Sequence, residues 1–116
     1  MARKAIWEWQ FAEVYPAYVQ KVEKKGRSKD DLHTVITWLT AYDEAGITDQ
    51  IARGTTLAEF FEDAPALHAN VGDIKGLICG VRVEDIEDPL TQKIRWMDKL
   101  VDELARGKKM ESVLRS

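Results

Sequence analysis

The residues that could form a nucleophile and its base are Cys79, the only cysteine of the chain, and His68, one of its two histidines. A catalytic cysteine needs a lowered pKa, which a helix N-terminus or a nearby cation supplies. Cys79 lies in "GLICG", where its neighbours in sequence are apolar. An inert, buried thiol is therefore expected, and no catalytic residue is assigned. A small-molecule binder or an enzyme built around His68 and Cys79 stays open as an alternative.

The acidic segment "EDIED", Glu84 to Asp88, could offer oxygen ligands to a hard cation. It lacks the ligand spacing of an EF-hand loop, and its charge suits the N-terminus of the helix that follows. His33 is expected on the surface of a helix, and a single histidine does not define a metal site. The sequence predicts no metal site and no cofactor.

Basic residues gather between two predicted helices, from Lys21 to Lys29. Cations there complement the dipole at a helix C-terminus, and no aromatic residues interleave with them as they would in a single-strand binder. The whole chain has 17 Lys and Arg against 20 Asp and Glu, a net charge of −3. Proteins that neutralise many phosphates usually show a basic excess, so nucleic acid is not an expected partner.

The stretch "AIWEWQF" places Trp7 and Trp9 one residue apart, ahead of the first predicted helix. In an extended chain Trp7, Trp9 and Phe11 share one face, while Glu8 and Gln10 share the other. Two interpretations stay open. The segment is an N-terminal arm that lays this face over the helices, or it is a binding surface, because tryptophan is enriched among interface hot spots.

The elements that must position these residues are helices, because apolar residues recur at helical spacing. The sequence predicts helices over 14–22, 28–39, 43–54, 55–65, 71–80 and 89–107, followed by a short amphipathic tail. Pro16 is expected in the first turn of its helix, where its missing N–H costs nothing. Over 71–80, a helix is favoured over a strand, because Gly72, Gly76 and Gly80 would form one smooth stripe for close packing.

The 89–107 segment gives the clearest signal, with Asp88 as N-cap, Pro89 in the first position and Gly107 just past the end. Its predicted inward seam is Leu90, Ile94, Met97, Val101 and Leu104, while Lys93, Asp98, Lys99 and Asp102 are expected to face water. Trp38 and Trp96 are expected in the core or at its rim. The predicted fold is all-α: a single compact domain of five to seven helices over residues 1–116, with a long C-terminal amphipathic helix and an N-terminal arm over 1–12.

A single cysteine forbids an intrachain disulfide, which favours a reducing compartment. No apolar run approaches the roughly 20 residues that span a bilayer. The start "MARKAIWEWQ" has no continuous apolar stretch of the kind a secretory signal needs. The expected location is the cytoplasm, with no membrane partner.

Three stretches carry a resemblance: "FAEVYPAYVQKVEKKGRSKDDL", "TWLTAYDEAG" and "IKGLICGVRVEDIEDPLTQKIRWMDKLVDELARGKKMESVLR". They resemble a family of small bacterial proteins, the domain of unknown function 2200. The block "CGVRVEDIEDPL…KLVDELA" is quite specific to it. The resemblance implies an all-α fold and no established activity, so it brings no catalytic residues.

The chain departs from the pattern of the family that it resembles, which has Tyr, a polar residue, Met and Ser at positions 7 to 10 and Gly at position 41. This chain has Trp7, Glu8, Trp9, Gln10 and Ala41 there. A serine at position 10 would form a capping box with Glu13, and Gln10 is expected to lose that cap at a cost of about 1 kcal/mol. A left-handed glycine would suit position 41. Departures from the preferred capping residues, together with two additional tryptophans, suggest an engineered variant with a repurposed surface.

The first functional hypothesis is a protein-interaction module that binds through Trp7, Glu8, Trp9, Gln10 and Ala41, with a protein partner of unknown identity. The alternatives are the small-molecule binder or enzyme around His68 and Cys79, and a protein that associates with itself as a homodimer through the same aromatic patch. Enzymatic activity is the less favoured class.

Overall fold

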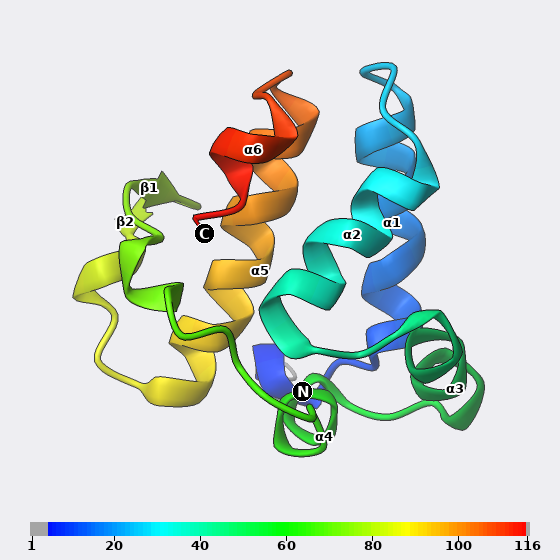
Figure 1. Cartoon of the computed structure of the whole chain (residues 1–116). Coiled ribbons are helices and arrows are strands. Elements are labelled where there is room, and N and C mark those ends of the chain that lie inside the picture. The colour runs from blue at the N-terminus through cyan, green and yellow to red at the C-terminus, as the bar shows by residue number, and fades with distance from the viewer. Residues whose placement is uncertain (1–4, 116) are drawn as a thin grey trace.

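The computed structural model describes residues 5–115 of the chain (Figure 1). Six α-helices occur in these residues, which confirms the predicted helical fold. Their order is α1 (Phe11–Glu23), α2 (Lys29–Thr40), α3 (Glu44–Arg53), α4 (Leu57–Glu62), α5 (Pro89–Ala105) and α6 (Met110–Val113). Single 3₁₀ turns lie at η1 (Ile6–Glu8), η2 (Val71–Asp73) and η3 (Val83–Asp85), and the strands β1 (Leu77–Ile78) and β2 (Val81–Arg82) form a small hairpin. Residues 1–4 of the predicted arm (1–12), and residues 1–4 and 116 of the predicted domain (1–116), lie outside the described residues.

The helix α5 is the central element, and it packs against α1, α2, α4, α6 and the hairpin. In Figure 1 it rises through the middle of the molecule, with α1 and α2 on one side and β1–β2 on the other. The predicted seam of α5 lies in the core: Ile94, Met97, Val101 and Leu104 are buried, and Leu90 is partly buried. On α2, the buried residues Leu32, Val35, Ile36 and Leu39 face the same core. Trp38 and Trp96 pack at its rim, as expected. None of the described helices has the length and apolarity that crossing a bilayer requires.

Local capping chemistry explains where the helices begin. The side chains of Ser28, Asp43, Thr56 and Asp88 each accept a hydrogen bond from a backbone N–H of the first helical turn. Such caps satisfy donors that the helix itself leaves open, and each contributes about 1 kcal/mol. Pro89 takes the first position of α5, where no N–H is needed. These starts match the sequence predictions.

The prediction for Pro16 was wrong. The helix α1 begins at Phe11, so Pro16 lies in its second turn and not in its first. A proline there cannot donate to the carbonyl of Ala12, and it removes one bond of the helical ladder. Burial of Phe11, whose side chain is fully enclosed, moves the start of the helix ahead of the proline.

The helix predicted over 71–80 is absent from the structure. Two residues, Cys79 and Gly80, connect β1 to β2, and Ile78 pairs with Val81. Cys79 has φ 50° and Gly80 has φ 82°, the left-handed pair that a tight hairpin turn requires. Gly76 also has a positive φ, 113°. The glycines therefore serve turn geometry, and no packing stripe forms.

The polar side of α5 also differs from the prediction. The side chains of Asp98, Lys99 and Asp102 retain only 19%, 14% and 15% of their exposure. They contact the hairpin and α1 and do not simply face water. Periodicity identifies the apolar seam, but it does not show that the flanking charges are covered by distant segments.

Candidate functional site

The aromatic arm, defined as Trp7, Glu8, Trp9 and Gln10, lies on the surface. Trp7 is 40% exposed and Trp9 is 44% exposed, although both side chains are large and apolar. The backbone beneath them is held to the start of α4: the Leu57 N–H donates to Trp9 O at 2.7 Å, and the Phe11 N–H donates to Thr55 O at 2.9 Å. The arm is therefore anchored by its backbone while its indoles remain accessible.

The arm is extended only in part, so the shared face of Trp7, Trp9 and Phe11 that an extended chain would have does not form. Ile6–Glu8 form a 3₁₀ turn, and only the bridge between Gln10 and Thr56 is strand-like. Phe11 does not share a face with the indoles, because it is fully buried and stacks on Phe60 with ring centroids 4.2 Å apart. Phe11 is a core residue, and the exposed aromatic surface consists of Trp7 and Trp9.

Part of the capping box is present at Gln10. Its backbone N–H donates to the Glu13 carboxylate at 2.8 Å, which is the half of a capping box that depends on residue 13. The expected loss of this cap is therefore partly wrong, because the Glu13 half of the box needs only the backbone of residue 10.

Ala41 ends α2 with φ 65° and ψ 10°, in the left-handed region. The sequence predicts a position suited to glycine here, and the left-handed backbone agrees with that prediction. Its N–H donates to Thr37 O at 2.8 Å. Ala41 is exposed, but within residues 5–115 no hydrogen bond joins it to the aromatic arm. Its inclusion in a binding surface with Trp7 and Trp9 stays a prediction.

His68 and Cys79 do not form a nucleophile–base pair. The His68 ring stacks on Trp38 with centroids 4.1 Å apart, and its Nδ1 accepts from the Asn70 N–H at 3.0 Å. Cys79 lies on the hairpin turn, and it is exposed, which corrects the expectation of a buried thiol. A hairpin turn places its residues at the surface, whereas the expected helix would have buried the thiol.

Cys79 has a cationic neighbour in space that the sequence spacing does not reveal. Arg95 Nη1 lies 3.3 Å from Cys79 Sγ, and the same nitrogen donates to Asp98 at 3.0 Å. Asp98 accepts a hydrogen bond from the Tyr18 hydroxyl. Burial, followed by the charge of Asp98, raises the pKa of Tyr18 well above its ordinary value. These contacts tie the hairpin to α5 and α1.

His33 is a buried residue, contrary to the prediction. Its Nδ1–H donates to the Glu44 carboxylate at 2.7 Å, so in the neutral tautomer Nε2 accepts from the Tyr15 hydroxyl at 2.5 Å. Burial, and then the charges of Glu44 and Glu23, raise the pKa of Tyr15, which keeps its hydroxyl a donor. The Tyr15–His33–Glu44 chain links α1, α2 and α3 beside an open groove of about 580 Å³ along α1.

The acidic segment has structural roles in the described chain. Asp88 caps α5, and hydrogen bonds from Thr91 lower the pKa of its carboxyl. Glu84 accepts from the Gly76 N–H at 2.9 Å, and this bond lowers the pKa of Glu84. Over residues 5–115, no three His, Cys, Asp or Glu side chains are grouped as metal ligands. The hydrogen bonds from Thr91 to Asp88 therefore support the interpretation that this segment places favourable negative charge at the start of α5.

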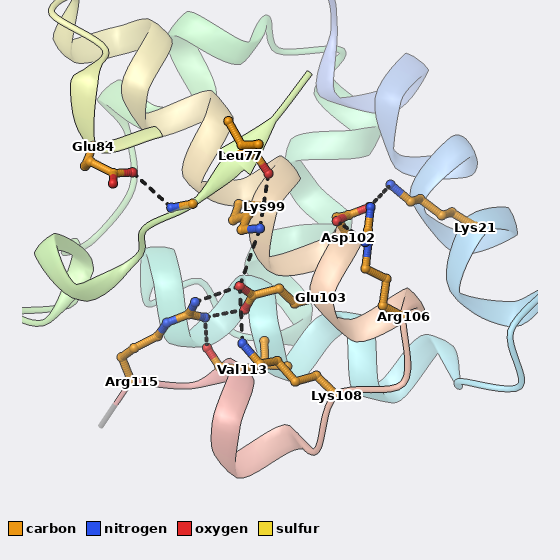
Figure 2. Close-up of polar contacts among 11 residues, drawn as sticks. Lys21, Leu77, Glu84, Lys99, Asp102, Glu103, Arg106, Lys108, Val113 and Arg115 are labelled. Atoms are coloured by element: carbon orange, nitrogen blue, oxygen red, sulfur yellow. Dashed lines mark hydrogen bonds and ion pairs between the residues drawn. The ribbon is translucent and has the colours of Figure 1, made fainter. Parts of the chain in front are cut away.

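A polar network at the end of α5 was not predicted from the sequence. Glu103 is 6% exposed, and Arg115 donates to both of its carboxylate oxygens at 2.5 and 2.8 Å (Figure 2). Lys99 and Lys108 lie 3.8 and 3.6 Å from the same carboxylate. Lys99 also donates to Leu77 O at 3.1 Å, beneath the hairpin. Sequence spacing revealed only the i,i+4 relation of Lys99 and Glu103, because Arg115 meets them only in the folded chain.

The basic run contributes to the same region. Lys21 lies 3.2 Å from Asp102, which also pairs with Arg106 at 2.9 Å. Arg27 donates to the carbonyl of Lys108. Part of the run therefore holds α1 and its following turn against the end of α5.

The chain belongs to the family described as "Uncharacterized protein conserved in bacteria (DUF2200)", whose model matches residues 5–115. A solved structure, titled "Crystal structure of uncharacterized protein SP1917", is similar to it with 44% sequence identity and a TM-score of 0.89. The similarity covers 98% of this chain and 93% of that one. No curated protein matches. Neither similarity supports the hypothesis of an engineered variant.

Proposed function

We propose that this member of a family of unknown function is a protein-interaction module, and that its aromatic arm is the surface that a partner protein covers. One observation carries the proposal: Trp7 and Trp9 are 40% and 44% exposed in a chain that buries its other aromatic side chains wholly or in part. Tryptophan is enriched among the residues that dominate binding energy at interfaces.

The anchored backbone supports the same function. A binding surface loses less entropy on association when it is already ordered. The bonds Leu57 N–H to Trp9 O and Phe11 N–H to Thr55 O fix the arm on both sides of Gln10. Burying each indole would remove its exposed apolar area from water, which contributes about 25 cal/mol of binding free energy per Å².

The polar residues of the arm fit the rim of an interface. Glu8 and Gln10 are exposed and flank the indoles in sequence. Interfaces usually have an apolar centre and a polar border that excludes water from it. We assign Trp7 and Trp9 to the centre, and Glu8 and Gln10 to the border. Ala41 is exposed, and we include it in the proposed surface.

The test uses a photo-crosslinking amino acid at position 8 in the full chain, expressed in bacterial cells. The matched control carries the same amino acid at Glu111, which is exposed at the other end of the chain. We expect a crosslink to one defined protein at position 8 and none at position 111. The crosslinked protein is then purified, and its affinity is measured by calorimetry against the unmodified chain.

The affinity measurement decides the assignment. The W7S/W9S variant should weaken binding by at least about 2 kcal/mol, roughly thirtyfold, because hot-spot tryptophans cost that much or more when removed. The matched control is L77S/V81S, which removes exposed apolar side chains from the hairpin and should leave affinity unchanged. Equal affinity for W7S/W9S and the unmodified chain would contradict the proposal.

A second copy of this chain is an alternative occupant of the surface. Sedimentation velocity across a hundredfold range of concentration distinguishes the two cases. A monomer at all concentrations agrees with a different protein as partner. A dimer that dissociates in the W7S/W9S variant would show that the surface binds a second copy of the chain. That result would overturn the assignment to a different protein.

A further inference from the structure

Positive charge is concentrated at the end of α5. Among residues 5–115, five cations form ion pairs there with two carboxylates, Asp102 and Glu103. The cations are Lys21, Lys99, Arg106, Lys108 and Arg115 (Figure 2). This excess occurs in a chain whose net charge is −3. The site is therefore electrostatically distinct from the chain as a whole.

The hydrogen-bonding geometry leaves donors available. Arg115 forms both close bonds to Glu103, at 2.5 and 2.8 Å. The ammonium groups of Lys99 and Lys108 stand at 3.8 and 3.6 Å from that carboxylate, beyond ordinary N–H···O distances. An ammonium group has three donors, and Lys99 commits one of them to Leu77 O. Both lysines thus retain charge and donors that Glu103 does not use.

These groups line a pocket. It has a volume of about 370 Å³ and is bounded by Lys99, Glu103, Arg106, Gly107 and Lys108. Small-molecule sites usually fall between roughly 300 and 1,000 Å³. Of the two lysines that line it, Lys99 is 14% exposed and Lys108 is 47% exposed. A side chain added at Gly107 would meet nothing within 4 Å, so the mouth is open on that side.

The end of the helix explains part of the charge, but not all of it. A helix C-terminus carries about half a negative charge, which favours nearby cations. Together with Glu103, it balances between one and two positive charges. Lys99, Lys108 and Arg115 all pair with Glu103, whereas Arg106 on the pocket wall is balanced by Asp102, 2.9 Å from its Nε. A ligand that carries one to two negative charges would balance the positive charge that remains.

We propose that this pocket binds the phosphate group of a small phosphomonoester, with the Lys99 and Lys108 ammonium groups as its principal partners and Arg106 at the entrance. A phosphate monoester carries close to two negative charges at neutral pH and has three strong acceptor oxygens. Lysine acts on phosphate as a point charge and needs no planar match. Free inorganic phosphate shares this chemistry and is the simplest probe.

The test is a calorimetric titration of the full chain with inorganic phosphate and, separately, with glycerol 3-phosphate. We expect saturable binding at one site, with the ester tighter if the pocket walls contact its organic part. The R106Q/K108Q variant should weaken binding by at least about tenfold, because both side chains are exposed and can be replaced without affecting the core. Circular dichroism of this variant should match that of the unmodified chain.

The matched control is R53Q/K93Q, which removes the same charge from α3 and the first half of α5, away from the residues that line the pocket. It should change affinity by less than about twofold at physiological salt. Equal losses in both variants would show that only overall charge matters, and would overturn the proposal. The absence of saturable binding to either probe would overturn it as well. Amide shifts on phosphate addition that lie outside residues 99–108 would place the ligand elsewhere and would also contradict it.

Discussion

Two residues other than glycine adopt left-handed backbone conformations in the described chain, Ala41 and Cys79. A side chain in this region meets the neighbouring carbonyl, at a cost of roughly 1–2 kcal/mol. Both residues end or turn an element: Ala41 closes α2, and Cys79 begins the turn of the β1–β2 hairpin. At the scale of the residue, the chain carries strain at places where glycine would cost less.

The A41G variant should increase the free energy of unfolding by about 1 kcal/mol, because glycine adopts φ 65° without a clash. Urea unfolding measures the change. The matched control is A45G, an exposed position inside α3, where glycine should lower stability by a similar amount. The same sign for both variants would contradict the assignment of strain to Ala41.

Tyr42 gives a residue-scale prediction about alkaline pH. Its hydroxyl donates to Phe60 O at 2.7 Å, and burial, followed by the charge of Asp63, raises its pKa to about 12. The unfolded chain releases this proton near pH 10, whereas the folded chain keeps it. Stability from this group is therefore complete below pH 10 and is lost as pH rises from 10 to 12. The Y42F variant should show a shallower loss of stability over that interval in urea unfolding, and an unchanged slope would contradict this.

At the scale of the element, Pro16 interrupts a helix that is otherwise regular. It stands in the second turn of α1, and the carbonyl of Ala12 has no helical donor. Pro89 occupies the first position of α5, where proline fits the helix without loss. One chain thus contains a proline that opposes its helix and one that favours it.

The P16A variant should therefore stabilise the protein, by up to about 3 kcal/mol, which is the cost of proline in a helix interior. Thermal unfolding followed by circular dichroism measures this change. The P89A control should leave stability unchanged or lower it slightly. If P16A destabilised the chain, the proline ring itself would have to contribute packing that outweighs the lost hydrogen bond.

The elements that could be predicted from the sequence are those with local signals. Ser28, Thr56 and Asp88 cap their helices through bonds to residues three positions away, so the pattern is complete within one turn. The hairpin could not be predicted in this way, because a glycine spacing of four suits a helical stripe as well as turns. Its geometry depends on Gly76, where a side chain would meet Lys99 at 3.2 Å, a residue far away in sequence.

At the scale of the whole molecule, the C-terminal segment is held by Arg115. Its guanidinium binds both oxygens of the buried Glu103, and its carbonyl accepts from Asn70 Nδ2 at 2.7 Å. These contacts join the end of the chain to α5 and to the segment before η2. The candidate sites could be predicted only in part, because exposure of Trp7 and Trp9 and convergence on Glu103 both depend on tertiary packing.

The R115Q variant should lower the free energy of unfolding by about 2–3 kcal/mol, because it leaves a buried carboxylate without its closest partner. Lys99 and Lys108 remain nearby and limit the loss. The matched control is R53Q, which breaks an exposed pair with Asp49 and should cost less than about 1 kcal/mol. Equal effects of the two variants would contradict a structural role for the Glu103 network.

The proposed interaction surface is a property of the whole molecule, because α4 anchors an arm that precedes α1. The most direct test is ¹⁹F NMR of the chain labelled with 5-fluorotryptophan, titrated with the crosslinked partner protein. The signals of Trp7 and Trp9 should shift and lose their solvent-dependent isotope shift as the complex saturates, while those of Trp38 and Trp96 stay in place. Binding that leaves the Trp7 and Trp9 signals unchanged would contradict the account.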